Sequence, residues 1–190
     1  GVNSFTKLPT ITPKVADFGN WKSLRGDVVR LDGKITVLGF SGTNLLANRG
    51  NLFNLNQKIY QRYHTFKDLQ FVMLCPLGTE KDAQAVLDAL KAFTDVKQWN
   101  FVFATPEEIT NFYKQMQLKS QLDSNYGTSN VFIFDKERNL RGRKDKEEFK
   151  EGYNTFHPAE LSNEMLDDFK ILLYEYKAAL KKNNNATKQL

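Results

Sequence analysis

Four short apolar runs constrain the fold of this chain more than any other feature. They are ITVLGF (35–40), LQFVML (69–74), WNFVFA (99–104) and NVFIFD (130–135). Their β-branched and aromatic residues are typical of strands that are covered on both faces of a sheet. Between the runs, apolar residues recur every three or four positions, which predicts amphipathic helices. The alternation favours a sheet with helices on either side.

The expected helices have apolar faces and recognisable start signals. The faces are predicted at Leu52, Leu55, Ile59 and Tyr63, at Ala83, Val86, Leu87, Leu90 and Phe93, and at Ile109, Phe112, Tyr113 and Met116. Thr79, with Asp82 three residues later, is a predicted N-cap. Thr105 is another, because Pro106 occupies the first helical position and Glu108 the third.

Hairpins and a long helix complete the predicted order of elements. Residues 21–34 (WKSLRGDVVRLDGK) predict an N-terminal β-hairpin, and residues 136–139 turn the last apolar run into an antiparallel partner, LRGR. A long helix is expected from Pro158, with Leu161, Met165, Phe169, Leu172, Leu173 and Tyr176 on its apolar side. Helical crossovers require parallel early strands, whereas the late hairpin adds antiparallel ones, so the sheet is predicted to be mixed.

The chain is predicted to form one domain. Its 190 residues are enough to bury a core without disulfides or metals, and no linker rich in Gly, Pro or Ser divides them. We expect residues 1–15 to be an extended lead-in, residues 16–182 the domain, and residues 183–190 a disordered polar tail.

Charge and cysteine content exclude several classes of function. The net charge is +5, but basic and acidic residues alternate along the chain, so no basic face for nucleic acid is expected. The densest basic run, residues 139–146, is interpreted as a solvated turn. A single cysteine, Cys75, rules out an intramolecular disulfide and a multi-thiolate metal site. No apolar run reaches the roughly 18 residues of a membrane span.

Four stretches, in order along the chain, support a family resemblance. They are LDGKITVLGF (31–40), LQFVMLCPLGTEKDAQAVLDAL (69–90), VKQWNFVFATPEEITNFYKQM (96–116) and NVFIFDKERNLRGRKD (130–145). Together they resemble the SenC/Sco family of copper chaperones, relatives of thioredoxin that assist cytochrome c oxidase assembly. The resemblance implies a thioredoxin-like α/β fold: a central mixed sheet flanked by helices, with an N-terminal β-hairpin and a long C-terminal helix.

The chain lacks the residues that carry out the chemistry of this family. Active members carry a CxxxC motif after the first core strand and a His near the later strand. Here residues 41–49 and the stretch SNYGTSN (124–130) contain neither Cys nor His. Copper(I) favours thiolate and imidazole ligands, and disulfide exchange needs two sulfurs. We therefore expect no metal ligands here and regard Ser41, Gly42, Thr43 and Asn44 as a vestigial active-site loop.

This loop has two interpretations. Small polar residues at the start of a helix can bind an anion. The simpler interpretation is an N-cap, in which Thr43 or Asn44 bonds the first helical turn. Asp82 is likewise either a remnant of the family's second loop acid or a favourable charge at a helix N-terminus.

Cys75 and the two histidines are the other candidates. Cys75 stands before Pro76, where the family has Asp, and is either a reactive thiol lining a remnant pocket or a small buried hydrophobe. The second interpretation is favoured, because nothing nearby in the sequence lowers its pKa. His64 and His157 are expected at helix ends or on the surface. The aromatic loop 151–161 either forms a partner surface or folds onto the core.

These observations favour a binding protein over an enzyme. We expect a non-catalytic, Sco-like binding or assembly factor for a protein partner in respiratory-complex or copper handling, with no cofactor. The alternative is a copper-binding or peroxidase-like thiol protein that acts through Cys75. The resemblance, and not the composition, implies a periplasmic location, either free or anchored to the membrane.

Overall fold

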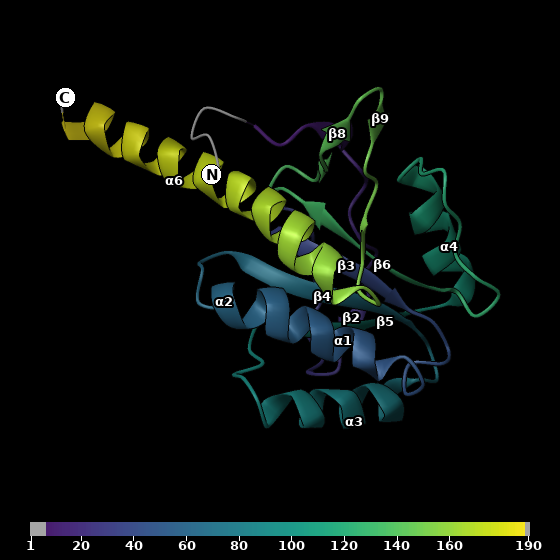
Figure 1. Cartoon of the computed structure of the whole chain (residues 1–190). Coiled ribbons are helices and arrows are strands. Elements are labelled where there is room, and N and C mark those ends of the chain that lie inside the picture. The colour runs from purple at the N-terminus through teal and green to yellow at the C-terminus, as the bar shows by residue number, and fades with distance from the viewer. Residues whose placement is uncertain (1–6, 189–190) are drawn as a thin grey trace.

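A mixed β-sheet lies at the centre of the protein, with helices on both faces (Figure 1). The computed structural model describes residues 7–188, with side chains described to residue 184. The strands run in the order β1-β7-β6-β3-β4-β5-β2, and β10 also pairs with β6. Their bounds are β1 Thr10–Thr12, β2 Lys22–Ser23, β3 Ile35–Ser41, β4 Leu69–Pro76, β5 Trp99–Ala104, β6 Gly127–Phe134, β7 Leu140–Arg141 and β10 Tyr153–Asn154. A separate ladder joins β8 (Lys144–Asp145) to β9 (Glu148–Phe149).

The central strands have the predicted directions. β3, β4 and β5 are parallel, β6 pairs antiparallel with β3, and β7 pairs antiparallel with β6. Every residue of β3 and β4 is buried, as expected for strands that are covered on both faces. The prediction of a mixed sheet flanked by helices is confirmed.

Helices from different parts of the chain cover the two faces. The first face packs against α1 (Arg49–Leu55), the π-helical segment η1 (Asn56–Tyr60), α2 (Gln61–Tyr63) and α3 (Glu80–Lys91). The same face packs against α5 (Pro158–Glu160), the π-helical segment η2 (Leu161–Met165) and the start of α6 (Leu166–Lys188). The second face packs against α4 (Pro106–Gln115) and the residues before β3. Each face therefore has its own apolar core.

The helix start signals have different outcomes. Thr105 forms the predicted capping box: its side chain accepts from the Glu108 N–H, and Glu108 accepts from the Thr105 N–H. Thr79 precedes α3 but makes no capping bond, because its hydroxyl donates to the Pro76 carbonyl at 2.8 Å. The prediction for Phe93 is wrong: α3 ends before it, and its side chain is exposed.

The ends of the domain differ in part from expectation. The N-terminal hairpin reduces to β2 and a single bridge between Lys22 and Val28. The lead-in contributes β1, which pairs with β7, whereas residues 1–6 lie outside the described part. Residues 183–188 continue α6 instead of forming a disordered tail, because no Gly or Pro interrupts the helix; residues 189 and 190 are not described.

The basic run 139–146 is more than a solvated turn. Arg141 is buried and forms ion pairs with Asp135 and Glu175. Arg143 pairs with the buried carboxylate of Asp168 at 2.9 Å. The earlier interpretation is wrong for these two arginines, whose partners join the β7 segment to α6.

Candidate functional site

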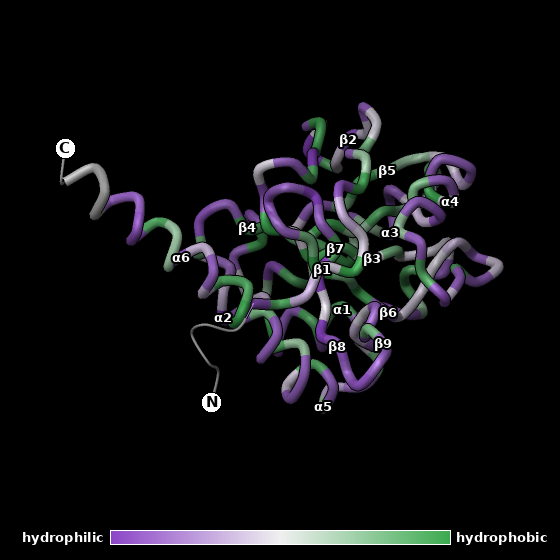
Figure 2. Tube along the Cα trace, turned by 90° about the horizontal axis from the view of Figure 1, so that it is seen from above, coloured by the Kyte–Doolittle hydropathy of each residue, from purple (hydrophilic) through white to green (hydrophobic). Residues whose placement is uncertain are grey.

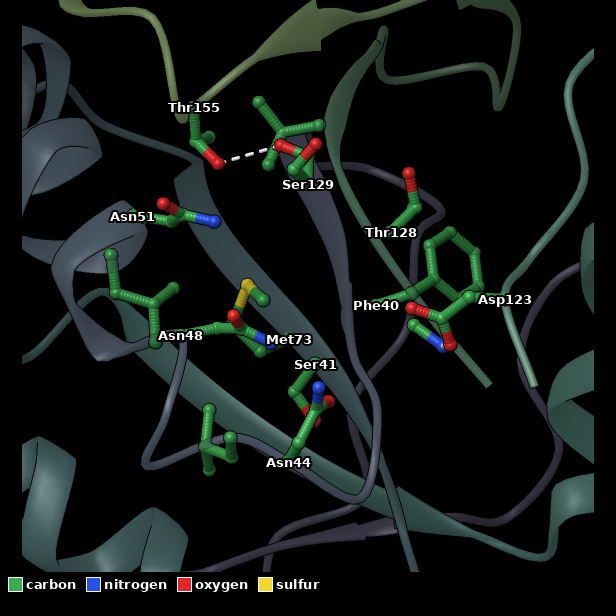
Figure 3. Close-up of a pocket in the computed structure, with 14 residues that line it drawn as sticks. Phe40, Ser41, Asn44, Asn48, Asn51, Met73, Asp123, Thr128, Ser129 and Thr155 are labelled. Carbon is green, nitrogen blue, oxygen red and sulfur yellow. Dashed lines mark hydrogen bonds between the residues drawn. The ribbon is translucent and has the colours of Figure 1, made fainter. Parts of the chain in front are cut away.

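A polar pocket of about 260 Å³ lies where β3 ends and β6 begins (Figure 3). Apolar side chains in its lining come from both strands, from β4, from the loop after β3 and from α1: Phe40, Leu45, Leu52, Met73 and Val131. Polar side chains complete the lining: Ser41, Asn44, Asn48, Asn51, Asp123, Thr128, Ser129 and Thr155. Of the four residues predicted to form a vestigial loop, Ser41 and Asn44 line this pocket, whereas Gly42 and Thr43 do not.

Two glycines allow the loop after β3 and the start of β6 to approach each other closely at the edge of the pocket. Gly42 has a positive φ of 69°, which favours glycine. A Cβ atom on Gly127 would lie 3.0 Å from the backbone of Gly42, closer than side chains normally approach. The Thr43 N–H donates to the Asn125 carbonyl at 2.9 Å, and the Thr43 hydroxyl donates to Asn125 Oδ1 at 3.2 Å. These contacts fasten the loop after β3 to the loop before β6.

The first helix starts later than the N-cap interpretation of this loop requires. α1 begins at Arg49, so its N-cap is Asn48, which makes no side-chain capping bond. Neither Thr43 nor Asn44 caps a helix, and the loop does not form the helix N-terminus on which the anion-binding interpretation was based. Asn48 and Asn51 both line the pocket, since they lie three residues apart at the start of α1.

The pocket offers hydrogen-bonding groups with little charge. The described residues that line it are neutral apart from Asp123. One oxygen of Asp123 already accepts from the backbone N–H groups of Asn125 and Gly127, at 2.8 and 3.0 Å. Asn44 Oδ1 is buried without a hydrogen-bond partner. A buried acceptor of this kind is costly unless a ligand or water donates to it.

The aromatic loop 151–161 contributes to the pocket in an unexpected way. Thr155 anchors it, because its hydroxyl and its N–H both donate to the Ser129 carbonyl, at 2.6 and 3.0 Å. Tyr153 is buried in the core, where its hydroxyl donates to Asp168, whereas Phe156 is 67% exposed. The loop therefore packs onto the core through one aromatic residue and presents the other to solvent.

Cys75 is not among the residues that line the pocket. It is fully buried in the core on the first face of the sheet, and its thiol donates to the Met73 carbonyl at 3.4 Å. Burial raises the pKa of the Cys75 thiol to about 12, although a hydrogen bond with Ser41 acts in the opposite direction. The thiol is therefore protonated at neutral pH and is shielded from reagents.

The remaining candidate residues lie apart from the pocket. His64 stacks on Tyr60, with ring centroids 5.5 Å apart, and His157 is exposed. Asp82 lies in the first turn of α3. Among residues 7–188, no group of three or more His, Cys, Asp and Glu side chains is arranged to hold a metal ion. Within the same range, no helix is both long and apolar enough to cross a bilayer.

Sequence reasoning missed most of the polar lining. The later-strand stretch 124–130 was singled out for its lack of His, yet Thr128 and Ser129 within it line the pocket. Asn48 and Asn51 carried a local signal, namely two amides one helical turn apart. Thr155 carried none, because only tertiary packing brings it to β6.

Among the comparisons with known proteins, only the one with solved structures gives matches, and these show the fold. No model of a known protein family matches the sequence, and no curated protein matches it. Solved structures do match, at low sequence identity. BsSco, a member of the Sco family of cytochrome c oxidase assembly proteins, superposes with a TM-score of 0.56 at 16% identity, over 92% of this chain and 98% of that one. The fold is thioredoxin-like.

Other Sco structures share this thioredoxin-like fold with the chain. The soluble domain of Sco1 from Bacillus subtilis gives a TM-score of 0.52 at 17% identity, covering 93% of this chain and 97% of that domain. Yeast Sco1 gives 0.51 at 14% identity, covering 83% and 99%. The resemblance drawn from the sequence is thus confirmed at the level of the fold.

Proposed function

We propose that this chain is a Sco-type thioredoxin-fold protein that acts by binding a protein partner and carries out neither copper nor thiol chemistry. The partner would belong to respiratory-complex assembly or copper handling, and the location would be periplasmic, free or membrane-anchored, as the resemblance implies. The main support is the pocket between β3 and β6, where hydroxyl and amide groups stand in place of the expected sulfur and imidazole.

The chemistry of the lining argues for binding over catalysis. Hydroxyl and amide groups are weak ligands for copper(I), and none of them can form a disulfide. Serine and threonine act as nucleophiles when a neighbouring base accepts their proton. No histidine lines the pocket within the described residues, and one oxygen of Asp123 is committed to backbone N–H groups.

The same groups suit an extended segment of a partner protein. Peptide N–H and C=O groups need matching acceptors and donors when a segment is buried. Asn44 Oδ1 is an unused acceptor, and Asn48 and Asn51 carry amides that can both donate and accept. Met73 and Phe40 supply apolar contact. A pocket of about 260 Å³ has room for a side chain and its adjoining peptide groups.

The alternative through Cys75 has little support. A peroxidatic or copper-binding cysteine must be a thiolate that its substrate can reach. Cys75 is fully buried with a raised pKa, and within the described residues it belongs to no group of three or more His, Cys, Asp and Glu side chains that could hold a metal ion. The single thiol is therefore assigned to packing.

The proposal can be tested by filling the pocket. In Asn51→Trp an indole replaces an amide that lines the pocket, whereas Lys81→Trp places the same bulk on the exposed side of α3. Detergent-solubilised membranes of the source organism would be passed over each immobilised protein. A partner captured by the parent should be retained by Lys81→Trp and lost by Asn51→Trp. Equal retention by both variants would place the partner's contact elsewhere and contradict the proposal.

A further inference from the structure

A second, chemically different cavity lies between α2 and α6, on the flank of the domain. Its volume is about 230 Å³, and Tyr63, Lys170, Leu173, Tyr174 and Lys177 line it. Leu173 is buried beneath it, and Tyr174 is 48% exposed. We call this cavity the α2–α6 slot. Its lining combines two ammonium groups and two phenols with an apolar floor, and it contains no carboxylate.

The two lysines of the slot are not neutralised by the protein. Within the described residues, neither Lys170 nor Lys177 takes part in an ion pair; Lys177 instead lies 6.0 Å from the ring centroid of Phe66. Arg62 adds a further positive charge near Tyr63, opposed by the carboxylate of Asp167. The slot therefore has excess positive charge and is suited to an anion.

The helix that forms one wall extends the basic surface. α6 projects beyond the body of the domain, as Figures 1 and 2 both show. After Glu175 the sequence has no acidic residue, whereas lysines stand at 177, 181, 182 and 188. Leu180 on the same stretch is 60% exposed. Exposed apolar and aromatic side chains among lysines are typical of helices that lie on a lipid headgroup layer.

From these observations we propose that the α2–α6 slot binds the phosphate of an anionic lipid headgroup while the projecting part of α6 lies against the lipid surface. Lys170 and Lys177 supply the charge for the phosphate, and the phenols of Tyr63 and Tyr174 supply aromatic contact at the interface. A lipid fits better than a soluble anion because the charge continues along an exposed helix that also carries Leu180. The slot is separate from the pocket between β3 and β6, so this inference does not depend on the proposed function.

The test is co-sedimentation of the full 190-residue chain with vesicles. Phosphatidylcholine vesicles with and without phosphatidylglycerol would be compared at physiological ionic strength, where exposed charges are screened over about 8 Å. We expect binding only when phosphatidylglycerol is present. Lys170→Gln/Lys177→Gln should weaken this binding about twenty-fivefold, since each lysine near an anionic surface accounts for roughly a fivefold change in affinity.

A matched variant separates the slot from net charge. Lys22→Gln/Lys81→Gln removes the same charge from exposed positions on β2 and α3 and should bind vesicles like the parent. Equal loss in both double variants, or no loss in the slot variant, would overturn the assignment. Calorimetric binding of inorganic phosphate without binding to vesicles would identify a soluble anion and overturn the lipid assignment. Circular dichroism would establish that each variant folds.

Discussion

Treating the folded protein with iodoacetamide tests whether Cys75 can take part in thiol chemistry. The thiolate is the reactive form, and burial raises the pKa of this thiol to about 12. At pH 8 roughly a quarter of ordinary thiols of pKa about 8.5 are ionised, against about one in ten thousand here. Ionisation alone therefore slows alkylation about two-thousandfold. Since the side chain is also fully buried, the reagent must wait for the structure to open.

The assay follows the mass increase of the intact protein with time. Cys75 should remain unmodified in the folded chain under conditions in which the urea-unfolded chain is alkylated completely. The unfolded sample is the control, because it contains the same thiol without the surrounding core. Alkylation of the folded protein within tenfold of the unfolded rate would refute the reasoning and restore Cys75 as a candidate reactive group.

Other predictions concern stability. Burial raises the folded-state pKa of Cys75 and Tyr60 to about 12, so their contribution to the free energy of unfolding is complete below their unfolded-state pKa values and is lost as pH rises from about 9 towards 12. The urea concentration at the unfolding midpoint should therefore be lower at pH 10 than at pH 8, and equal midpoints would contradict this. Asp168→Ala removes the buried carboxylate that Arg143 and Tyr153 contact and should lower the free energy of unfolding by about 3 kcal/mol. The control Asp167→Ala, at an exposed position, should change it by under about 0.5 kcal/mol, and comparable losses in both variants would refute the prediction. Thr105→Ala removes the capping box and should cost about 1 kcal/mol by the same measurement, and an unchanged value would count against the cap.

Local sequence was sufficient where local physics determines the structure. The apolar runs 35–40, 69–74 and 99–104 became buried parallel strands, because a covered strand needs apolar residues on both faces. The Thr105 capping box formed because all of its partners lie within four residues. Phe93 was wrongly assigned to an apolar face, since periodicity does not show where a helix ends.

Long-range contacts account for what the sequence did not reveal. The arginines of the 139–146 run are placed by Glu175 and Asp168, which lie more than twenty residues away. The candidate pocket likewise draws Thr155 and Ser129 from distant segments. The missing CxxxC and His were visible in the sequence, but only the fold shows that Ser41 and Asn44 line a cavity whose polar groups are neutral apart from Asp123.

The most direct test of the central claim is a copper(I) titration against a competing chelator, with the parent and Cys75→Ser run side by side. If hydroxyl and amide groups have replaced the metal ligands, neither protein should remove copper(I) from the chelator. Stoichiometric, tight binding by the parent that disappears in Cys75→Ser would contradict the account and assign the chain a copper site.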